Sequence, residues 1–251
     1  MGVEGDRKSL LILLAVLVGL SWSTIWAWQN SPYSSYLGHS GLAGVSSVTE
    51  LLSRGSIFIV GWSLMIFAMM LPTSIPFIVQ LRPLLGGSQL FATRFLVGYV
   101  GPWLPFGLLA YAGDWGLHSL VNRSTWLGNN EWLIGVSTLA LAGIYQFTRL
   151  KRKSLEDCCA PASSVISGWE GRNVRTFRIG AHHGISTVGN SWAMMLLMFA
   201  FGLESIAWMA VLLAVMAVEK EGRWGRRLAL PIGAVLLGSA TFLSLISLGI
   251  A

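Results

Sequence analysis

Long apolar runs without charged residues constrain this sequence more than any other feature. Only 11% of its residues are charged, whereas soluble domains carry about 25%. Most of the runs approach the roughly 20 apolar residues that cross the hydrocarbon core of a bilayer. The runs are Ser9–Trp28, Ile57–Val79, Leu90–Ala112, Trp132–Phe147, about His183–Val218, and Leu228–Ile250. The sequence therefore predicts an all-α fold, a polytopic transmembrane helix bundle.

The number of spans depends on the run at about 183–218. A single helix of this length would be about 54 Å long at 1.5 Å per residue, which is more than a bilayer requires. Gly202, Leu203 and Glu204 interrupt the run near its middle. Two helices joined by a tight turn give about seven spans in total. The alternative is six spans, one of which is long, tilted or broken.

The distribution of Lys and Arg favours seven spans. With a cytoplasmic N-terminus, seven spans place 15 of the 17 basic residues on the cytoplasmic side, whereas six spans place 11 there. Cytoplasmic loops are enriched in basic residues, and this enrichment explains the net charge of +6 without a nucleic-acid partner. We therefore expect a multi-pass protein with its N-terminus in the cytoplasm.

The segments between the runs are too short for a separate soluble domain, which needs about 50 residues. Residues 1–251 are therefore expected to form a single integral membrane domain, with a basic cytoplasmic loop at about 149–181. Tryptophans near the ends of the runs are typical of the boundary between lipid and water. They are Trp22, Trp26, Trp28, Trp103, Trp115, Trp126 and Trp132.

Two prolines lie inside the second apolar run. Pro72 and Pro76 each remove a backbone hydrogen bond, so a structural kink with freed carbonyls is expected there. Met65 and Met69 are four residues apart and share a helix face just before the kink. Thioethers and freed carbonyls would suit a path for a soft metal ion. The alternative is that these methionines fill irregular gaps in the packing.

A second methionine pair follows in the run at about 183–218. Met194 and Met198 are also four residues apart and share a face. They either continue the same path of soft ligands or face lipid and neighbouring helices as packing residues.

Cysteine and histidine pairs provide the other candidate metal ligands. Cys158 and Cys159 lie in the basic loop, and His182 and His183 follow at its end. Thiols and imidazoles on one face of the membrane would bind Cu(I) or Zn(II), either of which is a candidate cofactor. The alternative is unliganded cysteines in a basic loop that meets anionic lipid.

Motifs for enzyme chemistry are missing from the sequence. It contains no phosphate-binding loop, no GxSxG and no HExxH, so we expect a non-catalytic protein. Asp114 and His118 are four residues apart. They fit a weak metal or proton site or, as the alternative, a hydrogen-bonded pair at the membrane interface.

Three segments together resemble a bacterial family of predicted metal-binding integral membrane proteins, a domain of unknown function. They are Ala68-Met69-Met70-Leu71-Pro72-Thr73, Ala142–Thr148 followed by Leu150-Lys151 and Cys158, and His183-Gly184 leading to Trp192–Leu196. The resemblance covers most of residues 55–220. It implies a helical membrane fold, a metal role, and the bacterial inner (plasma) membrane as location.

This sequence differs from the family pattern at the ligand positions. Family members carry cysteines at the positions of Ser154 and Cys158 and near Thr187, Asn190 and Ser191, so only Cys158 and His183 match directly. Loss of thiols favours an accessory subunit that assists assembly of a larger membrane complex, with other integral membrane proteins and the lipid bilayer as partners. The alternative is a copper-type metal transporter or metal-delivery protein.

Overall fold

The structure is a computed structural model that describes residues 2–31, 48–85, 90–130, 132–158, 171–200, 205–220 and 225–249. These residues form helices and no strands, which confirms the all-α prediction for this part of the chain. The elements are α1 (Gly2–Gln29), α2 (Val48–Met65), the π-helix η3 (Ile66–Met70), α3 (Leu71–Leu84), α4 (Phe91–Val100), α5 (Trp103–Arg123), α6 (Thr125–Gly128), α7 (Trp132–Gln146), α8 (Arg149–Cys158), α9 (Arg172–Ala200), α10 (Ile206–Lys220) and α11 (Gly225–Ser247).

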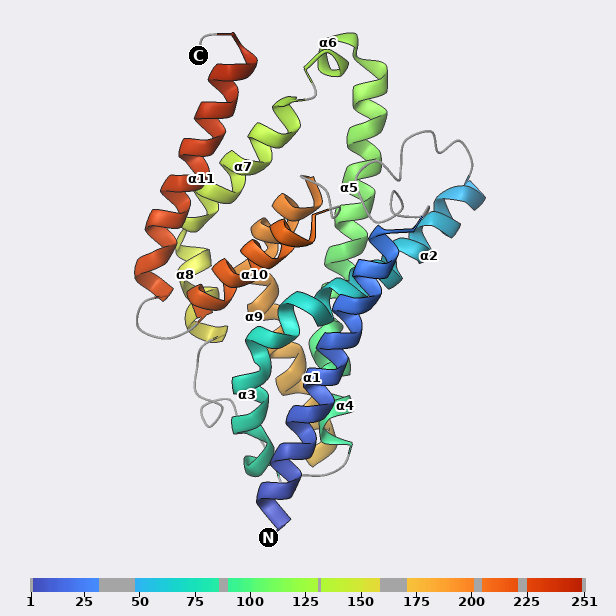
Figure 1. Cartoon of the computed structure of the whole chain (residues 1–251), viewed down its shortest axis with the longest axis vertical. Coiled ribbons are helices and arrows are strands. Elements are labelled where there is room, and N and C mark those ends of the chain that lie inside the picture. The colour runs from blue at the N-terminus through green and yellow to red at the C-terminus, as the bar shows by residue number, and fades with distance from the viewer. Residues whose placement is uncertain are drawn as a thin grey trace.

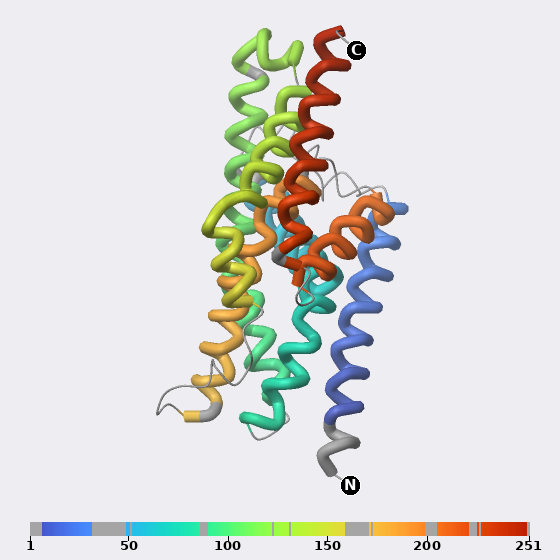
Figure 2. The backbone as a smooth tube through the Cα atoms, turned by 90° about the vertical axis from the view of Figure 1, so that its left-hand side faces the viewer, coloured from blue at the N-terminus to red at the C-terminus, as the bar shows by residue number. Residues whose placement is uncertain are grey.

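The helices form an elongated bundle whose two chain ends lie at opposite ends of its long axis (Figures 1 and 2). The longest helix, α9, rises through the bundle from the end near the start of α1 (Figure 1). Helices α4, α7 and α8 pack along α9, and α7 also packs along α11. This arrangement makes α9 the central element, and its side chains contact several neighbouring helices.

Four helical segments of the described chain are long and apolar enough to cross a membrane. They are Arg7–Gln29, Leu52–Leu84, Phe91–Val121 and Arg227–Ser247. A fifth is possible if α7 and α8, which meet at an angle of 68°, count as one broken span. The count of seven spans stays a prediction, and the proposed turn at residues 202–204 lies outside the described residues.

The basic loop expected at about 149–181 is partly helical, which corrects the sequence-based interpretation. Residues Arg149–Cys158 form α8, and α9 already begins at Arg172. Lys151, Ser154, Leu155 and Cys158 are buried; their spacing of three and four residues places them on one helix face. The segment forms a helix because this face packs against α9.

Glycines allow α4 and α9 to approach closely. A Cβ atom added at Gly98 would lie 2.3 Å from Phe177 O, and one at Gly180 would lie 2.3 Å from Phe95 O. At Gly184, one turn after Gly180, the added atom would lie 2.5 Å from Tyr99 O. The pattern of small residues four apart is common at close helix contacts in membranes. This contact fixes which face of α9 is turned toward α4.

The hydrophobic core contains every methionine after Met1. They are Met65, Met69, Met70, Met194, Met195, Met198, Met209 and Met216, each at most 2% exposed. The expectation of interfacial tryptophans is wrong for Trp103, which is fully buried and accepts a 3.0 Å hydrogen bond from Trp62 Nε1 at its backbone oxygen. By contrast, Trp26, Trp115 and Trp126 are exposed.

Candidate metal-handling site

In the π-helix η3, backbone carbonyl groups accept hydrogen bonds from side chains. Pro72 has no N–H to donate to Ala68 O, and this oxygen instead accepts a 3.0 Å hydrogen bond from Trp22 Nε1. Two residues on, Met70 O accepts hydrogen bonds from Thr73 Oγ1 at 2.8 Å and from Ser74 Oγ at 3.2 Å. The interruption expected at the prolines therefore takes the form of a π-helical segment just before them.

His183 lies beside Ser74. Its Nε2 is 3.1 Å from Ser74 Oγ, and Ser74 Oγ is 3.2 Å from Tyr99 OH. The imidazole stacks on Phe77, with ring centroids 4.2 Å apart and planes 5° apart. The side chain is 4% exposed, so the neighbouring aromatic ring and hydroxyl fix its orientation.

Two sulfur atoms lie near the same face of α9. Thr187 Oγ1 is 3.5 Å from Cys158 Sγ on α8. Ser191 Oγ, one turn further along α9, lies 2.6 Å from Thr187 O and 3.5 Å from Met70 Sδ on η3. These two hydroxyls form a short series along α9, one beside a buried thiol and the other beside a thioether.

A buried ion pair adjoins this series. Lys151 Nζ on α8 donates to Glu219 Oε2 on α10 at 2.6 Å and to Asn190 O on α9 at 2.8 Å. Gln146 Nε2 on α7 donates to Glu219 Oε1 at 2.9 Å. Each charge neutralises the other, because burying either one alone in a low-dielectric interior would cost several kcal/mol of free energy. The ion pair also joins four helices at one point.

These groups form one continuous feature, which we call the polar seam. The polar seam comprises Met70, Ser74, Lys151, Cys158, His183, Thr187, Asn190, Ser191 and Glu219. All of them are buried, and four of them lie on α9 at spacings of three and four residues, which place them on neighbouring faces. The helix thus supplies a common surface on which residues from η3, α3, α8 and α10 meet.

The structure separates the predicted ligands into two groups. Cys158 and His183 both belong to the polar seam, where Cys158 Sγ lies 3.5 Å from Thr187 Oγ1 and His183 Nε2 lies 3.1 Å from Ser74 Oγ. His182, in contrast, is exposed. Cys159 lies outside the described residues. The adjacent histidines are thus not equivalent.

The four predicted methionine ligands are buried in the hydrophobic core: Met65, Met69, Met194 and Met198. Their role as ligands stays a prediction. Met70, which was not among them, has its sulfur in the polar seam. Sequence reasoning also missed the pairing of Lys151 with Glu219, because these two residues are 68 positions apart in the chain. The apolar face of α8 was the available signal, since it placed Lys151 among buried residues.

The positions at which the resembling family carries cysteines come together at the contact between α8 and α9. Ser154 Oγ would lie 2.5 Å from a Cβ added at Gly189, and Cys158 faces Thr187. Asn190 and Ser191 follow on α9 and are buried. In this chain hydroxyl and amide groups therefore occupy a place where the resemblance implies thiols.

The donor atoms of the polar seam suit a soft metal ion better than a hard one. They include one thiol, one thioether and one imidazole, which favour Cu(I). The only carboxylate is Glu219, and the Lys151 ammonium already binds it. Among the residues that the structure describes, no three His, Cys, Asp or Glu side chains cluster as a metal site.

Comparison with known proteins supports this chemistry. Residues 59–243 match the PpoB2 family, which is described as a copper chaperone. No curated protein and no solved structure is detectably similar to the chain. The family match includes all of η3 and α3 to α10, and thus the whole polar seam. The chain belongs to the PpoB2 copper chaperone family.

Proposed function

We propose that this protein is a non-catalytic, membrane-embedded copper chaperone that holds Cu(I) as its cargo and delivers it to another integral membrane protein during assembly. The single observation that carries the proposal is that Cys158, His183 and Met70 lie along one face of α9, at Thr187, at His183 itself and at Ser191, within the region that matches a copper chaperone family. Soft sulfur and imidazole donors are the ligand types that Cu(I) prefers.

The surroundings of these donors fit temporary rather than permanent binding. Each donor atom lies 3.1–3.5 Å from a hydroxyl group in the described structure. Cu(I) would have to replace these contacts, and the hydroxyls would regain them when the ion leaves. A cargo site requires this kind of reversible exchange, whereas a structural metal site is closed by its ligands.

We further propose that the chain crosses the bacterial plasma membrane seven times, with its N-terminus in the cytoplasm. The placement of α1's start and α11's end at opposite ends of the bundle supports an odd number of crossings (Figure 2). In this topology the N-terminal end of α9, with Arg172, Arg175 and Arg178, faces the cytoplasm, as basic residues generally do.

A titration with Cu(I) tests the proposal directly. The detergent-purified protein competes with a chromogenic Cu(I) chelator, and the amount of Cu(I) retained per chain is measured. We expect stoichiometric binding by the wild type and a loss of affinity of roughly tenfold or more in the double variant Cys158→Ser/Met70→Leu. Absence of Cu(I) binding by the wild type would refute copper handling.

The matched control is Met209→Leu. This methionine is also buried, but its sulfur lies 3.8 Å from Gln29 Nε2 on α1 rather than in the polar seam. We expect the control to keep the wild-type affinity. An equal loss in the control would mean that methionine substitutions act through packing, and the site assignment would be wrong.

A second candidate function is an accessory assembly subunit that binds no copper itself. Hydroxyls at Ser154, Thr187 and Ser191, where the resembling family has thiols, favour this reading. It predicts that gentle extraction from the native membrane yields a stoichiometric complex with other membrane proteins and no copper on this chain. Purification as a partner-free, copper-loaded protein would exclude it.

A further inference from the structure

Aromatic rings from two helices enclose the imidazole of His183. Phe77 on α3 stacks on it, with ring centroids 4.2 Å apart and planes 5° apart. Phe95 and Tyr99 on α4 lie at centroid distances of 6.1 Å and 5.7 Å from the same imidazole. We call these three rings the aromatic enclosure. An ion bound to the buried imidazole of His183 would therefore have aromatic rings beside it in place of water.

The glycine contact between α4 and α9 holds two of the three rings in place. A Cβ atom added at Gly180 would collide with Phe95 O, and one added at Gly184 would lie 2.5 Å from Tyr99 O. These two glycines flank His183 on α9, and their partners are the two α4 residues of the aromatic enclosure. The close approach of the helix backbones thus brings both α4 rings to the imidazole.

The partners of His183 in the described part of the chain carry no charge. Its Nε2 lies 3.1 Å from Ser74 Oγ, and its ring contacts are Phe77, Phe95 and Tyr99. A tyrosine phenol is neutral near pH 7. The ion pairs found among the described residues do not include His183. The charge of an ion bound here would therefore be met by ring faces and a hydroxyl group, and not by a carboxylate.

The charge of an ion decides whether such surroundings accept it. The faces of aromatic rings attract cations, and this attraction rises in proportion to the charge, whereas the cost of leaving water rises with its square. A divalent ion would gain about twice the attraction at about four times the cost. Lys220 Nζ, which donates to Thr73 Oγ1 beside Ser74 at 2.7 Å, is itself a cation and does not offset that cost.

We propose that the aromatic enclosure makes His183 selective for a soft monovalent cation, and that Phe77 is a specificity-determining residue. The inference rests on the proposed copper function and identifies the part of the polar seam that discriminates against Zn(II) and other divalent ions. An imidazole that carries a cation is attracted to the face of the stacked Phe77 ring. His182, the preceding residue, is exposed, so water can solvate an ion of either charge there.

Parallel titrations with Cu(I) and Zn(II) test the selectivity of the detergent-purified full-length protein. Each ion competes with a chromogenic chelator, and the ratio of the two dissociation constants is measured. We expect the wild type to retain Cu(I) and to lose Zn(II) to its chelator. Phe77→Leu should weaken Cu(I) binding by roughly two- to thirtyfold, the range of a cation–π contact, and Phe77→Tyr, which keeps the ring, should restore it.

The matched control for the lost ring is Phe91→Leu. Phe91 is also buried, but its ring stacks on Phe95 with centroids 6.4 Å apart and does not contact His183. We expect this variant to keep the wild-type affinity for both ions. A loss equal to that of Phe77→Leu would show that the rings act only through packing, and Phe77 would not determine specificity.

A carboxylate at position 77 should reverse the selectivity. Zn(II) binds carboxylate oxygen together with imidazole nitrogen, so we expect Phe77→Asp to bind Zn(II) more tightly than the wild type by roughly tenfold or more. The neutral isostere Phe77→Asn should show no such gain, because only the charge differs between the two variants. The Phe77→Leu and Phe77→Tyr pair keeps the test decisive if Phe77→Asp misfolds.

X-ray absorption of the Cu(I)-loaded protein shows whether the imidazole itself binds the ion. We expect outer-shell scattering from an imidazole in the wild type and in His182→Gln, and its loss in His183→Gln. Phe77→Leu should weaken this signal while the far-UV circular dichroism stays unchanged. A change in packing alone would leave the imidazole scattering of the bound ion as it is in the wild type.

Several outcomes would overturn the selectivity while leaving copper handling intact. These are Zn(II) binding as tight as Cu(I) binding by the wild type, bound Cu(I) without imidazole scattering, and wild-type Cu(I) affinity in Phe77→Leu. In each case, a loss of affinity in Cys158→Ser/Met70→Leu would still support the copper proposal. A wild type that binds no Cu(I) would refute both.

Discussion

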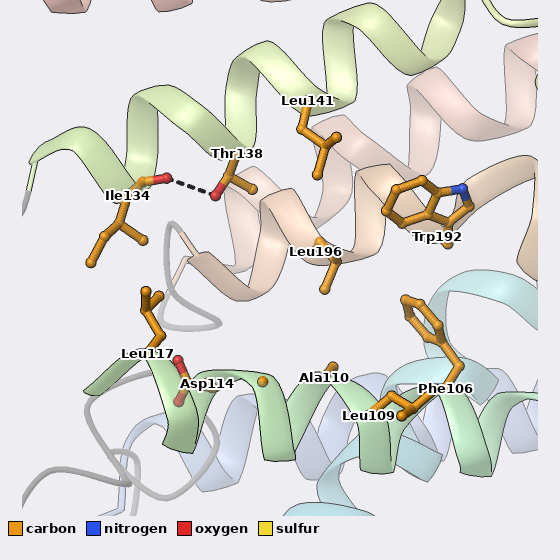
Figure 3. A pocket seen from close by; sticks show the side chains of 11 residues that line it. Phe106, Leu109, Ala110, Asp114, Leu117, Ile134, Thr138, Leu141, Trp192 and Leu196 are labelled. Carbon is orange, nitrogen blue, oxygen red and sulfur yellow. Dashed lines mark hydrogen bonds between the residues drawn. The ribbon is translucent and has the colours of Figure 1, made fainter. Parts of the chain in front are cut away.

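The polar seam and an apolar groove lined by residues of α5, α7 and α9 (Figure 3) hold their ionisable groups in different ways. In the polar seam, Lys151 and Glu219 come from different helices and neutralise each other within the chain. In the groove, Asp114 Oδ2 lies 3.7 Å from His118 Nδ1 on the same helix. The first arrangement stabilises the contacts between helices of one chain. In the second, the aspartate and the histidine belong to one helix, and the aspartate is buried beside an apolar groove.

The largest effect should come from breaking the ion pair of the polar seam. We expect Glu219→Ala to destabilise the protein by about 3–5 kcal/mol, because Lys151 then stays buried without a counter-charge. The measurement is the free energy of unfolding in mixed detergent micelles, titrated with a denaturing detergent.

The matched control for this prediction is Glu50→Ala. Glu50 pairs with Arg54 on the same helix, but both side chains are partly exposed to the surroundings. We expect this change to cost about 0.5 kcal/mol or less. A similar cost for Glu50→Ala and Glu219→Ala would contradict the claim that burial makes the Lys151–Glu219 pair different.

An intermediate effect should follow from separating α4 and α9. We expect Gly180→Ala to cost about 1–3 kcal/mol, because the new methyl group would lie 2.3 Å from Phe95 O and the backbone there has no side-chain freedom to yield. This change should also weaken Cu(I) binding, since it displaces His183 on the following turn. Thermal unfolding and the chelator titration measure the two effects.

Gly238→Ala on α11 serves as the control for the helix contact. No atom lies within 4 Å of the added Cβ atom, so alanine should stabilise the helix by about 0.5–1 kcal/mol. If Gly180→Ala also stabilises the protein, the close contact between Gly180 on α9 and Phe95 O on α4 would be contradicted.

The sequence was sufficient to predict the helical membrane class, because apolar run length alone decides it. It also singled out Cys158 and His183, which are buried in the polar seam, although their role as metal ligands stays a prediction. It did not distinguish His183 from His182, because only the glycine contact of α9 with α4 determines which histidine faces inward. Nor did it identify Lys151 and Glu219 as partners, since each appears in the sequence as an ordinary charge at the end of an apolar run.

The smallest effect on stability should come from neutralising the carboxylate of the groove. We expect Asp114→Asn to change the free energy of unfolding by about 0.5 kcal/mol or less, because the amide keeps the shape of the side chain and the 3.7 Å contact with His118 is longer than an ordinary hydrogen bond. The same detergent titration that detects Glu219→Ala measures it. A loss near that of Glu219→Ala would show that Asp114 is a structural residue of this chain like Glu219.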